Sequence, residues 1–458
     1  MDDNKKATLE LGTKPVGRLL VEYATPAIIA MTATSLYNTV DSIFIGQGVG
    51  PLAISALALT LPLMNLAGAF GAGVGVGAST FMSVKLGQRD YKTAVNILGN
   101  TLTLNFVISI IFAVAALLLL NPILRIFGAS DNTLPYAREY LIIILVGNPI
   151  THQYLGLNNM LRAASKPRQA MAATIFTVLL NTALDPVFIY GFGMGIQGAA
   201  VATVLAQAVA LVWELRLFSN SEELLHFTRG TYRLRSSIVR NIIGIGISPF
   251  AMNVCACVVV IFINNSLTFY GGDLAVGAYG IGNRIAFIFL MVVMGINQGM
   301  QPIAGYNYGA LHFDRLMRVV RYAMIAATCI TTTAFIVGEL APRPLARMFT
   351  TDAELTRLSV KAIRIMVMVF PVVGFQMVVT NFFQSIGKVK ISVFLSLSRQ
   401  LIFLLPLTLT LPLVLGVDGV WFSLPAADTI STITAWVLMS RYMKRFKRAR
   451  LESAPTKP

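Results

Sequence analysis

The sequence predicts an all-α membrane protein with twelve transmembrane helices in two six-helix bundles. Of the 458 residues, 56% are hydrophobic and only 12% are charged, whereas soluble domains carry about 25% charged residues. A spanning helix needs about 20 mainly apolar residues. The chain offers twelve such segments, at 19–45, 52–82, 95–120, 139–161, 169–191, 197–217, 241–269, 275–306, 317–339, 361–384, 391–414 and 419–442.

The second half of the chain repeats the first at an almost constant displacement. Pairs of identical residues 222 positions apart include Gly77/Gly299, Pro149/Pro371 and Asn159/Asn381. A constant offset over most of a half-chain indicates an internal repeat. Because six spans is an even number, both copies insert with the same orientation. We expect a pseudo-two-fold axis along the membrane normal to relate them, as in transporters built from parallel repeats.

This repeat divides the chain into four parts. They are an N-terminal six-helix lobe (1–218), a polar cytoplasmic linker (219–240), a C-terminal six-helix lobe (241–445) and a basic cytoplasmic tail (446–458). Two facing bundles imply a central cleft and a rocking motion between them. An alternating-access transporter requires that symmetry, and a channel or a membrane enzyme does not.

The net charge of +16 is unevenly distributed. Most Lys and Arg residues fall in the two termini and in every second loop, which by the positive-inside rule places both termini in the cytoplasm. The tail RYMKRFKRAR is therefore suited to anionic lipid headgroups, and we expect no nucleic-acid partner. The polar first eighteen residues predict no cleavable signal peptide.

Two carboxylates lie deep in apolar segments of the first half. Asp41 stands in YNTVDSIFIG and Asp185 in LLNTALDPVFIYG, and an ionisable residue at such depth is a functional candidate. Asn181 precedes Asp185 by one helical turn and shares its face, while Pro186 removes a backbone hydrogen bond and bends the helix. Thr203 is the first hydroxyl after the GIQGAA turn. If their spans touch, these side chains form one polar site.

Two close carboxylates in a poorly solvated place cannot both stay ionised, so the pair would titrate as a unit. Such a site takes up a proton or binds Na⁺ through its oxygens. Carboxylate, amide and hydroxyl oxygens serve both ions, so the coupling ion stays open. The competing interpretation, that each Asp only bonds a nearby backbone group, is weaker because asparagine would do the same with less desolvation.

The second half does not reproduce this acid pair. Asn264 stands at the position that matches Asp41, and Asp418 falls in a turn at the membrane interface. Asp428 remains as a candidate in the last span. Arg284 lies about one third of the way into its span. It could contact substrate, contact a carboxylate of its own half, or extend along the cleft toward water.

The sequence contains no recognisable catalytic motif. The motifs GxxxxGK[ST], HExxH and GxSxG are absent, so we expect no enzyme, no ATP hydrolysis by a P-loop, no cofactor and no structural metal. An ion gradient must then drive transport. The run Gly71, Gly73, Gly75 and Gly77 lies within a span without a preceding strand, and it predicts close helix packing.

These motifs resemble one known family. The resemblance is carried by the two-copy plan and by the segments SLYNTVDSIFIGQGVG, LGQRDY, LNNMLRA, NTALDPVFIYG and GIQGAAVAT. The chain resembles the multidrug and toxic compound extrusion (MATE) transporters, in the DinF-like branch and nearest to MepA-like drug exporters. The resemblance covers nearly the whole chain. It implies an antiporter of the bacterial inner membrane that exports varied lipophilic, often cationic compounds in exchange for H⁺ or Na⁺.

The resemblance also implies site residues. The cation site of that branch falls on Asp41, Asn181, Asp185 and Thr203, where neutralising either acid is expected to bend the first span. Substrate contacts fall on Met31, Met64, Asn158 and Asn159, to which we add Tyr37, beside Asp41, and Arg284. The methionines would suit an adaptable apolar pocket, although ordinary packing explains them equally well. We expect a monomer that binds small-molecule drugs or toxic organic cations and contacts membrane lipids.

One alternative function is a flippase for a lipid-linked precursor, since related families share the two-lobe plan. A flippase should present a basic cleft to a pyrophosphate group. One deep arginine against two deep aspartates favours cationic cargo instead.

Overall fold

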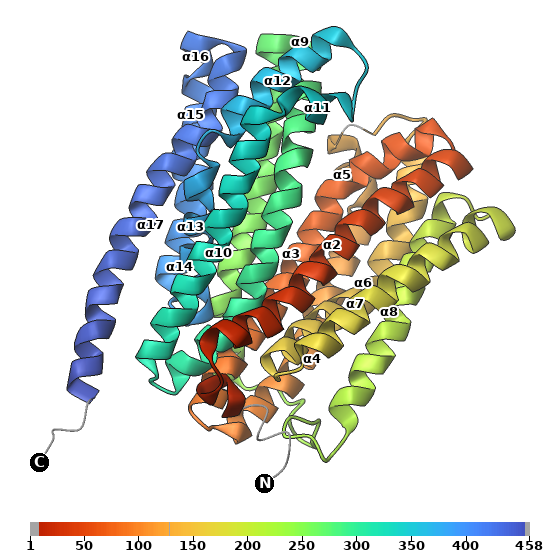
Figure 1. Ribbon diagram of the computed structural model, residues 1–458. Coiled ribbons are helices and arrows are strands. Elements are labelled where there is room, and N and C mark those ends of the chain that lie inside the picture. Colours follow the sequence, from red (N-terminus) through yellow and green to blue (C-terminus); the bar gives the residue numbers. More distant parts are fainter. Residues whose placement is uncertain (1–8, 128, 454–458) are drawn as a thin grey trace, which may run out of the picture. The chain divides into compact units, whose positions relative to one another are not determined.

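The computed structural model describes residues 9–127 and 129–453. The predicted basic tail, 446–458, lies outside the residues whose side chains are described. Every regular element in the described chain is a helix (Figure 1). The predicted all-α class is therefore confirmed.

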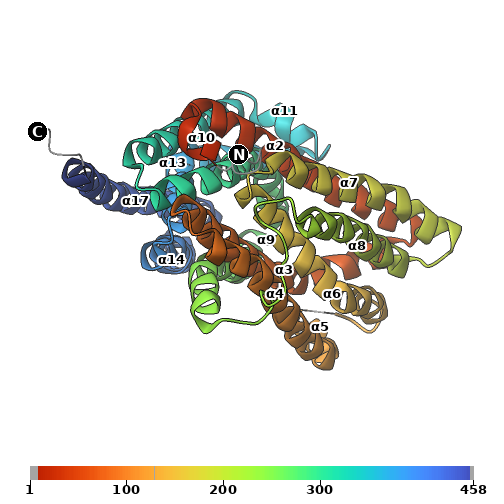
Figure 2. The same ribbon diagram turned by 90° about the horizontal axis from the view of Figure 1, so that it is seen from below.

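From Val16 on, the described part of the first half contains six long helices and two short ones. Their bounds are α2 Val16–Gly48, α3 Pro51–Gly87, α4 Tyr91–Leu118, α5 Leu120–Ile126, α6 Leu134–Ala163, α7 Pro167–Pro186, the π-helix η1 Val187–Gly191, and α8 Ile196–Ser219. Within this half α7 and α8 pack side by side, and α6 packs against both α3 and α8 (Figure 2).

The second half contains the same number of long segments in more pieces. The bounds are α9 Ser236–Gly309, α10 Phe313–Leu340, α11 Pro342–Arg347, α12 Ala353–Val367, α13 Phe370–Ser385, α14 Val389–Leu397, the π-helix η2 Ser398–Leu404, α15 Leu405–Thr410, α16 Pro412–Leu415 and α17 Val417–Ser453. The long α9 comprises two predicted spans joined at Gly272, whose φ of 65° and ψ of −168° interrupt the helix. Glycine reaches that φ without steric penalty.

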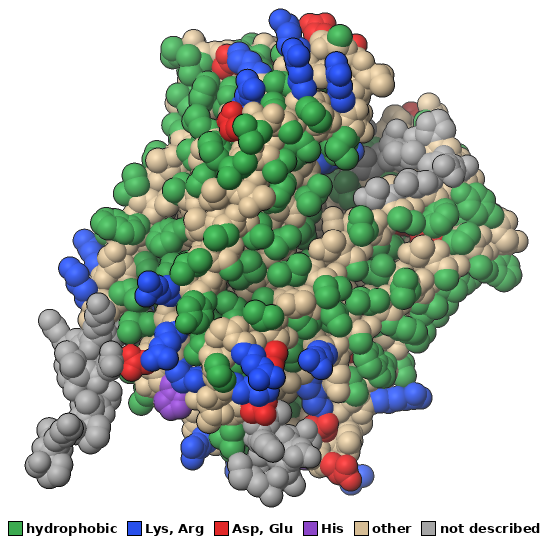
Figure 3. Space-filling view, viewed as in Figure 1, with side chains coloured by type: hydrophobic (Ala, Val, Ile, Leu, Met, Phe, Trp, Pro, Cys, Tyr) green, Lys and Arg blue, Asp and Glu red, His purple; other side chains and the backbone are tan. Residues whose placement is uncertain are grey.

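All twelve predicted segments are helical. By length and composition, nine helices of the described chain are apolar enough to cross a membrane, and ten if the pair α12 and α13, bent by 51°, counts as one span. The other two segments are α6 and α17, which are as long but carry more polar residues. On the face in Figure 3, apolar side chains cover the middle of the helices and charged ones gather near their ends. This distribution suits a membrane-spanning protein.

The described chain forms two compact units. The first contains Ile29–Phe250, and the second contains Leu11–Ile28 and the described residues from Ala251 onward. The boundaries therefore fall inside α2 and α9 rather than in the linker. The first part of α2 packs tightly in the second unit, because Gly299 of α9 has no side chain and leaves room for the backbone of Ala24.

The glycine run of α3 packs closely, as predicted. A Cβ on Gly77 would lie 2.2 Å from the carbonyl oxygen of Ile242 in α9, and one on Gly73 would lie 3.1 Å from that of Gly246. Gly71 and Gly75 face α6 instead, where a Cβ would meet side chains at 3.0 Å. Alternate glycines thus let α3 approach two helices of the first unit, α6 and α9, at close range.

A single buried side chain of α4 holds the linker. Asn100 Nδ2 donates to the carbonyls of Thr231 at 2.8 Å and Arg233 at 3.1 Å, and Asn100 Oδ1 accepts from the Arg235 N–H at 2.7 Å. The linker is therefore an anchored part of the first unit.

We expect Asn100→Ala to release this segment, because three backbone groups lose their partner and each such bond contributes about 0.5–1.5 kcal/mol. Trypsin should then cleave after Arg229, Arg233 or Arg235 faster by on the order of tenfold. Asn241→Ala, which removes only an exposed bond to Ser237, is the matched control and should leave the cleavage rate unchanged. Equal rates in both variants would show that Asn100 does not anchor the linker.

Candidate functional site

The four residues predicted for the cation site come together inside the first unit. Asp41 lies on α2, Asn181 and Asp185 on α7, and Thr203 on α8. The exposed fraction is 7% for Asp41, 2% for Asn181 and 0% for Asp185. Asp185 is followed by Pro186, which lacks a backbone N–H, and at this point α7 widens into the π-helix η1. Such π-helical turns are frequent at functional sites.

The π-helix fixes α7 to both neighbouring helices. The Tyr190 hydroxyl donates to the Phe44 carbonyl of α2 at 3.2 Å. Gly198 of α8 leaves room for the backbone at Phe188, to which a Cβ would come within 2.8 Å. The turn after Asp185 therefore brings α2, α7 and α8 to one place.

The Asn181 side chain connects the Asp185 carboxyl group to the Thr203 hydroxyl group. Its Nδ2 donates to Asp185 Oδ2 at 2.9 Å, and its Oδ1 accepts from the Thr203 Oγ1 at 3.0 Å and from the Thr203 N–H at 2.8 Å. The reverse amide orientation would set Nδ2 3.0 Å from Thr203 Oγ1 but would point the amide oxygen at acceptors only, so the first orientation is the consistent one. Asn181 thereby holds Asp185 in place.

The two carboxyl groups lie close enough to interact electrostatically. Two close carboxylates in a poorly solvated place cannot both stay ionised. Asp41 Oδ1 is buried without a hydrogen-bond partner. The Tyr37 hydroxyl lies 3.1 Å from Thr203 Oγ1. Among the described residues, no Lys or Arg forms an ion pair with either acid. The site is therefore rich in oxygen and lacks a cation of its own.

The residues predicted to contact substrate are placed differently. Met64 packs in the apolar cluster that contains Tyr140 and Ile189, close to the acids, and Met31 is half-buried on α2. Asn158, however, is engaged elsewhere: its Nδ2 donates to Glu214 Oε1 at 3.0 Å and its Oδ1 accepts from Arg162 at 2.6 Å.

The other two predicted substrate contacts are Asn159 and Arg284. The Asn159 amide oxygen also accepts from Arg162, at 3.1 Å. Arg284 is exposed on α9 and, within the described chain, forms no hydrogen bond or ion pair. It therefore does not contact a carboxylate of its own half. The substrate contacts at Met31, Tyr37, Met64, Asn158, Asn159 and Arg284 stay predictions.

The two candidate acids of the second half, Asp418 and Asp428, are each paired with a cation. Asp418, near the start of α17, accepts from Lys361 at 2.6 Å, as suits an interfacial residue. Asp428, 7% exposed, accepts from Arg399. Arg399 lies at the start of η2, inside the predicted span 391–414. Apolar residues flank it in ISVFLSLSRQLIFLLPL, so its depth, but not its partner, follows from the sequence.

Comparison with known proteins agrees with the fold and with the repeat. The sequence profile of the MatE family matches residues 26–187 and again residues 249–410, so the two matches are displaced by a constant 223 positions. Two halves that repeat one helical unit, with a polar site buried in one of them, are typical of membrane transporters built from parallel repeats. This chain belongs to the MatE family.

Named relatives cover almost the whole chain. It is 26% identical over 422 residues to the multidrug export protein MepA of Staphylococcus haemolyticus (strain JCSC1435), spanning 92% of this chain and 93% of that protein. A structure of the MATE multidrug transporter DinF-BH, described as a complex with a ligand, is 38% identical, with a TM-score of 0.87 over 94% of this chain and 96% of that one.

A further structure shares the fold. An outward-facing conformation of a multidrug resistance MATE family transporter is 24% identical and superposes with a TM-score of 0.90, over 96% of this chain and 98% of that one. The comparisons lend no support to a lipid flippase.

Proposed function

We propose that the protein is a cation-coupled antiporter that exports lipophilic, often cationic drugs and toxic compounds by alternating access. The observation that carries this proposal is the pair of neighbouring carboxyl groups, Asp41 and Asp185, which are buried in one unit and form no ion pair with a Lys or Arg of the described chain. The relatives named as multidrug exporters support the same function. We further propose that the protein acts as a monomer in the bacterial cytoplasmic membrane. The distribution of its charges supports a cytoplasmic location of both termini.

The pair couples cation to cargo through its charge. When the carboxyl groups hold a proton or Na⁺, the buried site loses negative charge, and a cationic substrate is attracted less strongly. When the cation leaves, the negative charge returns and the substrate binds. A ligand shifts a conformational equilibrium only by its different affinity for the two states. Exchange of cation for substrate therefore requires that the cation and the substrate each stabilise a different orientation of the transporter, one open to each side of the membrane.

The first helix is suited to respond to this charge. α2 carries both Asp41 and, fifteen residues earlier, Pro26 in its interior. The proline removes one backbone hydrogen bond and makes the helix easier to bend there. Neutralisation of the carboxyl pair would then bend α2 and close the substrate space beside it.

Purified protein in lipid vesicles provides the test. With a fluorescent cationic rhodamine dye as the probe, an imposed pH gradient or an imposed Na⁺ gradient should drive dye across the membrane, and the gradient that does so identifies the coupling ion. A gradient collapsed by an ionophore is the matched control and should abolish dye movement.

Two results would overturn the proposal. Dye movement that persists at the same rate after both gradients are collapsed would exclude cation coupling. Movement of a fluorescent lipid between leaflets, with no movement of dye, would favour the flippase.

A further inference from the structure

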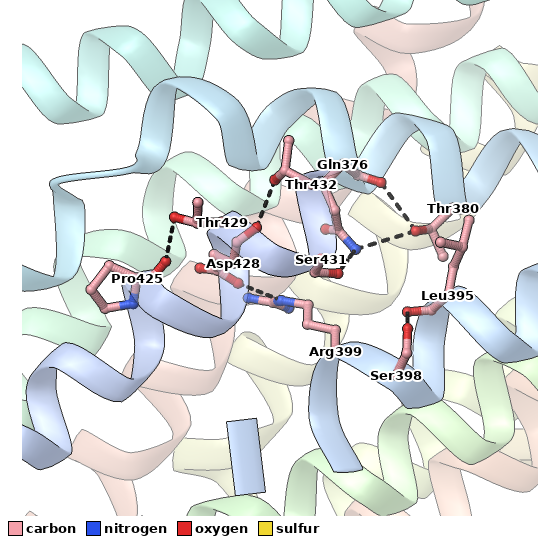
Figure 4. A network of polar contacts seen from close by, with 10 residues as sticks. All are labelled: Gln376, Thr380, Leu395, Ser398, Arg399, Pro425, Asp428, Thr429, Ser431 and Thr432. Atoms are coloured by element: carbon pink, nitrogen blue, oxygen red, sulfur yellow. Dashed lines mark hydrogen bonds and ion pairs between the residues drawn. The ribbon is translucent and has the colours of Figure 1, made fainter. Parts of the chain in front are cut away.

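The second unit contains a buried ion pair that the proposed function does not use. Arg399 Nε donates to Asp428 Oδ1 at 2.6 Å, and the side chains are 28% and 9% exposed (Figure 4). Arg399 is the second residue of η2 and Asp428 lies within α17. An ionisable pair inside spanning segments requires an explanation, because desolvating both charges is unfavourable.

The surroundings of this pair are polar but uncharged. Gln376 of α13 donates to Ser431 Oγ and Thr380 Oγ1, both at 3.3 Å (Figure 4), and Thr432 donates to the Asp428 carbonyl at 2.7 Å. Tyr279 of α9 is the other ionisable side chain that acts on Arg399. Within the described chain, neither Arg399 nor Asp428 forms another ion pair. The two charges therefore neutralise each other locally.

The repeat places this pair on the helices that correspond to those of the cation site. In the second copy, α14, η2 and α15 correspond to α7 by the repeat, and α17, the next long helix, corresponds to α8 by its order in the chain. Each of the two segments that include α7 and α14 contains a π-helix, η1 at the end of the first and η2 within the second.

Relative to the Asn181–Thr203 contact of the first copy, the Arg399–Asp428 pair of the second copy is displaced by one helical turn. The residue 222 positions after Asn181 is Phe403, and Arg399 lies four residues before it. Near the end of the two copies the displacement is 221, as between Gly195 of GIQGAA and Gly416 of GVDGVW. The residue 221 positions after Thr203 is Leu424, and Asp428 lies four residues after it. Because consecutive spans are antiparallel, both displacements move along the helix axes in the same direction, by about 6 Å. The ion pair is thus the displaced counterpart of the Asn181–Thr203 contact.

We propose that Arg399 is a tethered counter-ion, which occupies in the second unit the place that an exchangeable cation takes in the first. This inference rests on the proposed coupling role of Asp41 and Asp185. The guanidinium group is permanently protonated, and its charge-assisted bond to Asp428 is of the strong kind. H⁺ or Na⁺ would have to displace a covalently attached cation to bind there. Of these two corresponding places, only the one in the first unit can therefore exchange its cation.

Removal of the tethered charge should expose a latent cation site. In Arg399→Gln, assayed in Na⁺-free buffer, the buried Asp428 carboxylate loses its partner and must take up H⁺. Dicyclohexylcarbodiimide, which modifies protonated carboxyl groups in apolar surroundings, should label Asp428 at least about tenfold faster than in the parent protein, since an uncompensated buried charge is strongly unfavourable. Peptide mass spectrometry of the full-length protein in detergent measures the label at each acid separately.

Two controls keep the result interpretable. Arg399→Lys retains a tethered cation and should keep Asp428 unlabelled. The parent protein carries no substitution that could prevent folding. It should be labelled at the Asp41–Asp185 pair but not at Asp428. If Arg399→Gln does not fold, these two measurements still decide the question.

The inference is overturned if Asp428 of the parent or of folded Arg399→Lys is labelled as fast as the acid pair, or if folded Arg399→Gln leaves Asp428 unlabelled. The labelling of Asp428 is measured in detergent and does not depend on transport activity. A failure of the proposed antiport would instead appear as vesicles that move no dye, whatever the labelling at Asp428, so the two failures are distinguishable.

Discussion

Asp185→Asn and Asp41→Asn should each reduce gradient-driven dye efflux by at least about tenfold, because a cation site built on a carboxyl pair loses its charge change when either acid becomes an amide. The substitutions are nearly isosteric, so the packing of α2, α7 and α8 is retained. Stability should not fall, since removing a buried ionisable group lessens the unfavourable desolvation. Initial rates of efflux from vesicles, together with thermal unfolding of the same preparations, measure both expectations.

The matched control is Asp131→Asn. Asp131 belongs to the same unit but is exposed in a loop, where it pairs with Arg125, and an exposed pair contributes little. Its variant should transport at the parental rate. Parental efflux in both Asp41→Asn and Asp185→Asn would exclude the carboxyl pair as the coupling site. Loss of efflux in the Asp131 variant as well would point to a general defect of the preparation.

Gly77→Val should destabilise the first unit severely. A Cβ at this position would lie 2.2 Å from the Ile242 carbonyl oxygen and 3.0 Å from the Gly246 nitrogen, both backbone atoms. Side chains can rotate away from an added group, but two helix backbones must move apart as rigid bodies. Overpacking of this kind lowers stability by about 1–3 kcal/mol or more, and we expect the apparent melting temperature to fall by at least about 5 °C.

Gly68→Ala provides the comparison within the same helix. No atom lies within 4 Å of a Cβ placed there, and alanine is favoured over glycine in a helix by about 1 kcal/mol. Its melting temperature should therefore stay level or rise. A Gly77→Val protein as stable as Gly68→Ala would show that α3 and α9 do not pack at this distance.

Part of the fold and of the site follows from local features of the sequence. Apolar segments of spanning length predict helices because a backbone in lipid must satisfy its own hydrogen bonds. Asn181 and Asp185 share a face because they are four residues apart, and their depth in an apolar segment marks them as functional. The alternation of Gly71, Gly73, Gly75 and Gly77 predicts close packing. These properties depend on short stretches of chain, and they can be inferred without tertiary contacts.

Other properties depend on residues that are distant in sequence. Asn158 resembles a substrate ligand in LNNMLRA, but Glu214 and Arg162 engage its side chain, and no local pattern specifies those partners. Arg399 lies in the predicted span 391–414, but no local pattern specifies Asp428, 29 residues later, as its partner.

By itself, the sequence determined the class of protein, its duplication and the acids of its candidate cation site, because hydropathy, repeat offset and buried charge can each be read along the chain. Only the tertiary structure decided which polar groups meet. It paired Asp41 with Asp185, left Asp41 Oδ1 without a partner, and gave the Asp428 carboxylate a permanent cation. The reason is that the charge state of a buried carboxyl group depends on what lies within a few ångströms of it, and side-chain packing between helices determines that neighbourhood.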